Sequence, residues 1–195
     1  MNILIIGGAG VVGQKLAKAL AAKGTLRGKE ITRITLADVV QPTAIDAPFT
    51  VDTVKCDITD PASMNTTITA DTDVIYLLAA IVSGQAEAEF DLGWQINMHG
   101  TINVLERARA LGTKPVVVFS SSMAVYGGDT PDPITDFSSL NPQTSYGAQK
   151  AIGEMMVTDY SRKGFIDGRA FRLPTISVRP GKPNLAASSF MSSIF

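Results

Sequence analysis

The sequence is poor in the residues that several common kinds of site require. Its 195 residues include one cysteine and one histidine. A disulfide within the chain, a zinc site of Cys and His ligands and a His-based catalytic triad are therefore excluded, and we expect no metal site. The longest uninterrupted apolar run, residues 74–82, is far shorter than the roughly 20 residues of a membrane-spanning helix.

Charge is also scarce, and it is balanced. The chain has 17 basic and 18 acidic residues, a net charge of −1 and no basic cluster. We therefore expect neither nucleic acid nor a membrane as a partner. The apolar stretch 1–13 lacks the basic lead and the cleavage site of a signal peptide, so we expect a cytoplasmic protein. The 45% of residues that are apolar are enough to form a large core.

Short apolar runs alternate with longer stretches of helical periodicity, a pattern typical of a parallel sheet covered on both faces. Strands are predicted at residues 2–6, 31–37, 50–56, 73–78, 116–119 and 169–173, and helices at residues 11–23, 61–70, 85–111 and 145–163. This order predicts an α/β fold of the Rossmann type, a doubly wound parallel sheet with helices on both faces.

Three glycines, Gly7, Gly10 and Gly13, follow the first strand and begin the first helix. A dinucleotide diphosphate approaches the backbone closely at such a turn, where a Cβ would block it, and the N–H groups of Val11 and Val12 could bind it. Glycine spacing alone is weak support, and a tight turn with close helix packing is the alternative. The placement of the glycines between strand and helix favours a cofactor site.

Asp38 ends the second predicted strand, 25 residues after Gly13. A carboxylate there can accept hydrogen bonds from the adenosine ribose hydroxyls and would repel a 2′-phosphate, so we predict NAD rather than NADP. No arginine lies in residues 39–45 to offset that repulsion. The alternative is that Asp38 only stabilises the loop that follows it.

Tyr146 and Lys150 are four residues apart near the start of a predicted helix, so their side chains share a face. A free tyrosine has a pKa of about 10, and a neighbouring ammonium lowers it, which would let Tyr146 act as a base. Ser122, at the end of the fifth strand, could hydrogen-bond the same substrate oxygen. A purely structural origin of all three residues is the alternative reading.

These motifs resemble those of the extended short-chain dehydrogenase/reductases, also called the NAD-dependent epimerase/dehydratases. The resemblance covers residues 1 to about 185 and rests on residues 7–13, 57–58, 77–80, 97, 100–101, 120–122, 125–127 and 146–150. It implies Ser122, Tyr146 and Lys150 as the catalytic residues and NAD as the cofactor. The cofactor contacts that it implies are Asp57 and Ile58 around the adenine, Leu78, Ala79, Ala80 and Asn97 along the cleft, Tyr146 and Lys150, and Pro174 beside the nicotinamide.

Residues 172–190 depart from the pattern of nucleotide-sugar epimerases and resemble a branch of the family that oxidises a small sugar acid at C2. Arg179 and Asn184 could bind the substrate carboxylate, although Arg179 could instead brace a loop. Ser83 and Ser122 are further candidate substrate contacts. The resemblance divides the chain into an NAD-binding domain, residues 1–173, and the start of a truncated substrate-binding lobe, residues 174–195.

Three functions remain open at this point. The first is a dehydrogenase that oxidises a secondary hydroxyl of a small sugar acid and releases NADH. The second is an epimerase or dehydratase that uses bound NAD on a nucleotide sugar. The third is an NAD-binding fragment without activity. A homodimer formed through the two long predicted helices is also possible.

Overall fold

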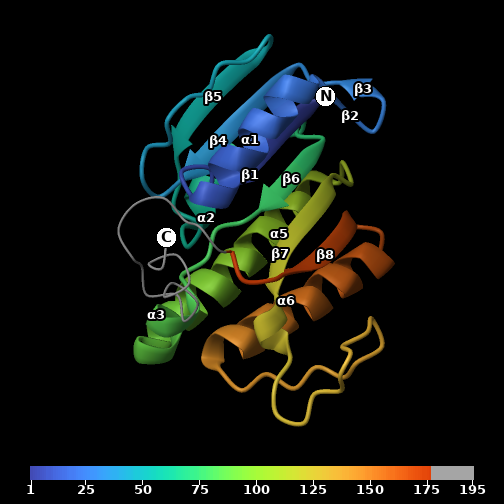
Figure 1. Cartoon of the computed structure of the whole chain (residues 1–195). Coiled ribbons are helices and arrows are strands. Elements are labelled where there is room, and N and C mark those ends of the chain that lie inside the picture. The colour runs from blue at the N-terminus through green and yellow to red at the C-terminus, as the bar shows by residue number, and fades with distance from the viewer. Residues whose placement is uncertain (177–195) are drawn as a thin grey trace, which may run out of the picture.

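The computed structural model describes residues 1–176, which form a single six-stranded parallel sheet with its helices and a small hairpin (Figure 1). The strands are β1 Asn2–Ile6, β4 Arg33–Asp38, β5 Thr50–Lys55, β6 Val74–Leu77, β7 Val116–Ser122 and β8 Asp167–Leu173, in the spatial order β5-β4-β1-β6-β7-β8. The predicted Rossmann-type sheet is confirmed. The strand order reverses between β1 and β6, the place where such sheets bind ligands.

Four main helices pack on the two faces of the sheet. They are α1 Val11–Lys23, α2 Pro61–Thr67, α5 Gly100–Leu111 and α6 Ser145–Arg162. β1 shows how the faces divide: Ile3 and Ile5 pack toward α1, and Leu4 and Ile6 pack toward α2, α5 and α6. All four side chains are 2% exposed or less, and each such burial stabilises the fold by roughly 1.5–3 kcal/mol.

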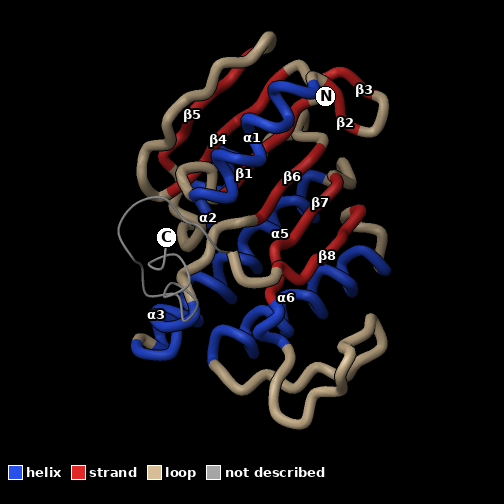
Figure 2. Tube along the Cα trace, viewed as in Figure 1, coloured by secondary structure: helices blue, strands red, loops and turns tan. Residues whose placement is uncertain are grey.

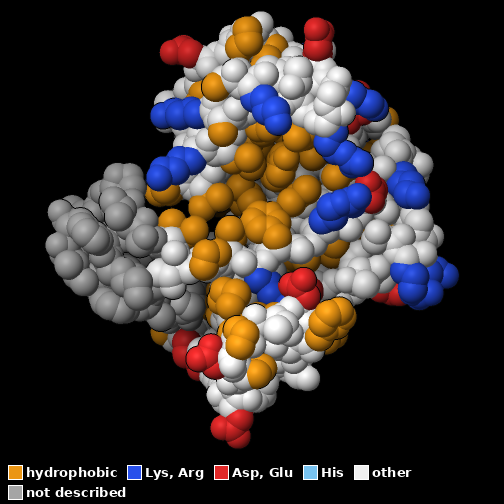
Figure 3. Space-filling model, turned by 45° about the vertical axis from the view of Figure 1, so that its right-hand side comes forward, with side chains coloured by type: hydrophobic (Ala, Val, Ile, Leu, Met, Phe, Trp, Pro, Cys, Tyr) orange, Lys and Arg blue, Asp and Glu red, His pale blue; other side chains and the backbone are white. Residues whose placement is uncertain are grey.

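The two faces are covered unequally within residues 1–176. α1 packs on one face, mainly over β1 and β4. Beyond it, Tyr76 of β6 and Val116 and Val118 of β7 are only half-buried. Hydrophobic side chains gather in a hollow on this side of the molecule, rimmed by Lys and Arg (Figure 3). The expectation of helices on both faces is confirmed, with one helix on the α1 face of the described region.

Residues 85–111 are helical over most of their length, as predicted, but the structure divides this stretch into four segments. They are α3 Ser83–Ala88, α4 Phe90–Gly93, the π-helical turn η1 Trp94–His99 and α5. Glu89 interrupts the run with φ −122° and ψ 72°, outside the helical region. The π-helical turn, with bonds from residue i to i+5, changes which side chains face inward, and a 3.6-residue period cannot reveal it.

Smaller features were also absent from the sequence prediction. β2 Thr25–Leu26 and β3 Lys29–Glu30 form a hairpin, and Met123–Val125 forms a 3-10 turn, η2. α2 ends at Thr67, short of the predicted residue 70, because Ile68 is extended. The long connection between η2 and α6 contains neither helix nor strand (Figure 2).

Candidate active site

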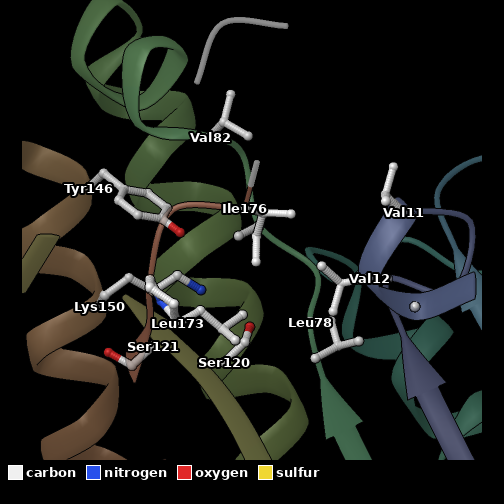
Figure 4. Close-up of a pocket in the computed structure, with 15 residues that line it drawn as sticks. Val11, Val12, Leu78, Val82, Ser120, Ser121, Tyr146, Lys150, Leu173 and Ile176 are labelled. Atoms are coloured by element: carbon white, nitrogen blue, oxygen red, sulfur yellow. The ribbon is translucent and has the colours of Figure 1, made fainter. Parts of the chain in front are cut away.

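Two neighbouring cavities lie at the C-terminal ends of the parallel strands and share four lining residues, Gly7, Gly10, Leu78 and Ala80. The tyrosine cavity, of about 290 Å³, is also lined by Val11, Val12, Gly13, Val82, Ser120, Ser121, Tyr146, Lys150, Leu173, Pro174 and Ile176 (Figure 4). The aspartate cavity, of about 390 Å³, is also lined by Ile6, Asp38, Val39, Cys56, Asp57, Ile58, Thr59, Ala79, Ile81, Leu92, Gln95 and Ile96.

Gly7, Gly10 and Gly13 differ in what an added Cβ would contact. Gly7 has φ +94°, and a Cβ there would lie 2.7 Å from the backbone nitrogen of Ala79. A Cβ on Gly13 would lie 2.3 Å from the carbonyl oxygen of Gly7, so this glycine permits the helix to pack on the loop. A Cβ on Gly10 would meet only the Gly7 oxygen, at 3.4 Å, and would otherwise occupy open space. Gly10 therefore keeps room for a ligand.

The start of α1 faces this open space. Val11 and Val12 occupy the first turn and line the tyrosine cavity. Among the residues that the structure describes, no side chain caps this end of the helix, and its first turn holds no acidic residue. The free backbone N–H groups and the positive end of the helix dipole favour an anion there. The cradle therefore fits the diphosphate of a dinucleotide.

Strand β4 holds the glycine loop in place. The carbonyl oxygen of Ala37 accepts hydrogen bonds from the backbone of Gly7, at 2.8 Å, and of Gly8, at 2.9 Å. The next residue, Asp38, accepts a hydrogen bond from the backbone N–H of Ala9 through Oδ2, at 3.0 Å. Asp38 therefore lines the aspartate cavity with one carboxylate oxygen already bound and the other available to a ligand.

The predicted adenine contacts lie on the far side of the same cavity. Asp57 follows β5, and its Oδ1 accepts hydrogen bonds from the backbone N–H and the hydroxyl of Thr59, at 2.9 and 2.8 Å. Ile58 is buried, and its side chain packs against Gly100 of α5. Leu78, Ala79 and Ala80 follow β6 and form the wall toward β1. Asp38, Asp57, Ile58 and the 78–80 segment thus surround one space.

Tyr146 and Lys150 project from the first two turns of α6 into the tyrosine cavity, and the Tyr146 hydroxyl points into its interior (Figure 4). The Lys150 ammonium lies 5.6 Å from the centre of the Tyr146 ring and 4.7 Å from that of Phe119. Lys150 is 3% exposed, and among the described residues its ammonium forms no ion pair. Burial lowers the pKa of Lys150 to about 8.

The three serines at the end of β7 have different environments. Ser120 donates a hydrogen bond to the carbonyl oxygen of Leu77, at 3.1 Å, while the buried hydroxyl of Ser121 has no partner in the described part of the chain. Both residues line the tyrosine cavity. Ser122, the predicted catalytic serine, does not appear in this lining. Its Oγ caps η2 by accepting a hydrogen bond from the backbone N–H of Ala124, at 3.1 Å. Its hydroxyl hydrogen is not used by that contact.

The remaining predicted contacts are placed as follows. Pro174 lines the tyrosine cavity. Ser83 begins α3, directly after Val82, which lines it. Asn97, predicted to line the cofactor cleft, lies behind the wall instead: its Oδ1 accepts a hydrogen bond from the backbone N–H of Ile81, at 3.0 Å. Arg179 and Asn184 lie outside the described residues.

The structure adds residues that sequence reasoning did not single out. The guanidinium of Arg172, at the end of β8, binds the carboxylate of Glu154 on α6, at 2.7 Å, and the hydroxyl of Tyr126 after η2. Arg172 thereby joins the end of β8, directly before Leu173 and Pro174, to α6 and to the segment after η2. Leu173, Val82 and Ile176 give the tyrosine cavity its apolar walls. Their apolar character alone did not distinguish them from core residues.

Within residues 1–176, no cluster of three or more His, Cys, Asp and Glu side chains could hold a metal ion. No helix in the same region is both long enough and apolar enough to cross a bilayer.

Comparisons with known proteins agree with this geometry. The chain is 54% identical over 198 residues to the D-erythronate dehydrogenase of Cupriavidus necator and 46% identical over 194 residues to that of Haemophilus influenzae. Each match covers all of this chain and 61% of the relative, so the chain spans about three fifths of the length of these relatives.

A solved structure described as a nucleoside-diphosphate-sugar epimerase from Agrobacterium tumefaciens is 49% identical and superposes with a TM-score of 0.93, covering 100% of this chain and 58% of that one. The model of the NAD dependent epimerase/dehydratase family matches residues 3–194. With the Rossmann-type sheet and the glycine cradle described above, this match shows that the chain belongs to the NAD dependent epimerase/dehydratase family.

Proposed function

We propose that the chain is an NAD-dependent oxidoreductase that oxidises a secondary hydroxyl of a small sugar acid, such as D-erythronate at C2, with Tyr146 as the base. The observation that carries the proposal is the Tyr146–Lys150 pair facing a cavity that is continuous with the glycine cradle. The two D-erythronate dehydrogenases among its relatives supply the substrate class. We also propose that residues 1–173 are the NAD-binding domain and that residues 174–195 begin the substrate-binding lobe.

The two cavities divide the binding of NAD between them. The aspartate cavity would hold the adenosine, with the Asp38 carboxylate accepting hydrogen bonds from the ribose and Asp57 and Ile58 beside the adenine. The backbone of Val11 and Val12 would bind the diphosphate. The tyrosine cavity would hold the nicotinamide near Pro174, with Lys150 bound to its ribose. The carboxylate of Asp38 would repel the 2′-phosphate of NADP.

The chemistry follows from the side chains around the Tyr146 hydroxyl. The ammonium of Lys150 favours the phenolate form of Tyr146, and the phenolate takes the proton of the substrate hydroxyl. Ser122 donates a hydrogen bond to the same substrate oxygen. NAD supplies the acceptor for the hydride that leaves the carbon. Arg179, Asn184 and Ser83 are the proposed contacts of the rest of the substrate.

A second candidate function is epimerisation of a nucleotide sugar, favoured by the high similarity to the solved Agrobacterium tumefaciens structure. The same residues would serve, but hydride would return to the substrate and no NADH would accumulate. A third candidate is binding of NAD without catalysis.

One set of measurements tests all three. We expect the purified chain to bind NAD, measured by calorimetry, and to produce NADH, measured by absorbance, when D-erythronate is added. Conversion of a UDP-hexose without net NADH would favour the epimerase. NAD binding with no turnover of either substrate would favour the third candidate, and absence of NAD binding would overturn the proposal.

A further inference from the structure

A buried pair of side-chain amides connects the helix that carries Tyr146 to the loop after β6. Asn97 and Gln149 are 3% and 1% exposed, and Asn97 Nδ2 donates a hydrogen bond to Gln149 Oε1 at 2.7 Å. Gln149 lies on α6 between Tyr146 and Lys150 in sequence. Asn97 binds both backbone groups of Ile81, accepting from its N–H at 3.0 Å and donating to its carbonyl oxygen at 3.4 Å. The contacts form a continuous path from Ile81 to α6.

The other end of this path touches the aspartate cavity. Ile81 lines that cavity, and so do Gln95 and Ile96, which directly precede Asn97 in the π-helical turn. No residue of α6 lines it. A ligand seated there would therefore meet the residues that hold Asn97, without meeting α6 itself.

The amide of Gln149 costs stability that an apolar side chain would not. Its Nε2 is buried and has no hydrogen-bond partner within residues 1–176, and a buried unsatisfied donor is unfavourable. The packing also makes room for it, since a Cβ on Gly93 would lie 2.7 Å from this nitrogen. If the residue only filled space, a methionine would fill it without the unpaired donor. The amide is therefore explained better by its contact with Asn97.

A second contact holds the start of α6. The carboxylate of Glu87, on α3, accepts a hydrogen bond from the backbone N–H of Ser145 at 2.8 Å. α3 directly follows Ile81 and Val82 in the chain. The first two turns of α6 are thus bound at Ser145 and at Gln149 by the segment that extends from the β6 loop through the π-helical turn.

From these contacts we infer that Asn97 and Gln149 are positioning residues. When the adenosine half of NAD occupies the aspartate cavity, they connect its wall to the first two turns of α6 and so order Tyr146 and Lys150. The inference rests on the proposed function for the identity of the ligand. It adds two residues that act through others: Asn97 holds Ile81 in the cavity wall, and Gln149 holds the helix that presents the base.

The test uses ADP, which carries the adenosine and the diphosphate but no nicotinamide, and measures amide hydrogen exchange in residues 145–152 of the full chain. In the unmodified protein, saturating ADP is expected to slow exchange in this segment about fivefold. In Gln149→Met, ADP is expected to bind with an affinity within about twofold of the unmodified protein, while the slowing disappears. Gln149→Met removes the unpaired donor and leaves Asn97 bound to Ile81, so we expect it to fold normally.

The matched control is Gln85→Met, on α3, where the glutamine amide donates a hydrogen bond to the side chain of Glu89, the residue directly after that helix. This variant is expected to keep the ADP-induced slowing in full. ADP binding without any change in exchange of residues 145–152 in the unmodified protein would overturn the inference alone, as would retained slowing in Gln149→Met. Failure of ADP to bind the unmodified protein would overturn the proposed NAD site and the inference with it.

Discussion

The aspartate cavity and the tyrosine cavity share the glycine loop, but the side chains that line them differ in charge and polarity. The aspartate cavity lies at strand ends and presents carboxylates, Asp38 and Asp57, which remain accessible to water. The tyrosine cavity presents one buried cation, Lys150, against aromatic rings and apolar walls. The difference indicates that one cavity serves recognition by hydrogen bonding, while the other concentrates a charge where it can change the acidity of a neighbour.

The largest expected effect is on turnover, in a variant of Tyr146. In Tyr146→Phe the base is lost but the cavity walls remain, so turnover is expected to fall about 10³-fold with NAD affinity within about twofold of the unmodified protein. Steady-state rates and calorimetry measure the two effects. Tyr160→Phe is the matched control, because Tyr160 lies on the same helix and binds Glu106 away from both cavities. Turnover retained in Tyr146→Phe would remove this residue from the mechanism.

Two glycine variants at the start of α1 are expected to have different effects, one on the stability of the fold and the other on NAD affinity. Gly13→Ala forces a Cβ against the backbone oxygen of Gly7 and is expected to lower the free energy of unfolding by about 3 kcal/mol. Gly10→Ala meets open space, so its free energy of unfolding is expected to stay within about 1 kcal/mol, while NAD affinity falls more than about tenfold. Denaturant unfolding and calorimetry distinguish the two. Equal stability of both variants would contradict the geometry of the cradle.

The buried cation of the tyrosine cavity is expected to reduce the stability of the unliganded fold. Burial lowers the pKa of Lys150 from 10.5 to about 8, so below pH 8 the folded state carries the whole cost of burying the ammonium. Between pH 8 and about 10.4 the unfolded chain binds more protons, and stability rises with pH. Lys150→Met should therefore be more stable than the unmodified protein at pH 7, by about 3 kcal/mol, and the gain should vanish near pH 10.

Thermal unfolding at the two pH values measures this gain, and turnover should be lost in the same variant. Lys163→Met, at the exposed C-terminal end of α6, is the control and is expected to change stability little at either pH. A Lys150→Met protein less stable than the unmodified one at pH 7 would show that the ammonium is stabilised by its surroundings.

The smallest expected effect concerns the charge of the aspartate cavity. Asp38→Asn keeps an oxygen that can accept the hydrogen bond from Ala9 but removes the repulsion of a 2′-phosphate, so the preference for NAD over NADP should fall about tenfold. Asp52→Asn is the control for net charge, because Asp52 lies on the edge strand β5, where it pairs with Arg33, and does not line the aspartate cavity. If Asp38→Asn discriminates between the two cofactors as strongly as the unmodified protein, Asp38 does not select the cofactor.

The sequence predicts the regular parts of this molecule well, because they follow simple periods. The bounds of β1 and α1 agree with the structure residue for residue, since a continuous apolar run meets glycines and then a helical period. The same period predicts most of the helix at residues 85–111 but not the π-helical turn within it. That turn directs Asn97 inward to Ile81 and Gln149, so the position of Asn97 behind the cavity wall could not be derived from spacing.

The candidate site divides in the same way. Motif spacing indicates where a backbone turns and which side chains share a helix face. It therefore predicts several residues that line the two cavities, namely Gly7, Gly10, Gly13, Asp38, Tyr146 and Lys150. Gln149 and Arg172 were not, because their partners are 52 and 18 residues away in sequence and only the folded chain brings them together. Pairings over such separations leave no local pattern.

The hydrogen bonds from Gly7, Gly8 and Ala9 to Ala37 and Asp38 also bear on the thermodynamics of ligand capture. They order the loop when the chain folds, so the conformational entropy of that loop is lost before any nucleotide arrives. The adenosine end should then bind with little rearrangement, at a rate set by diffusion into an open cradle rather than by loop closure.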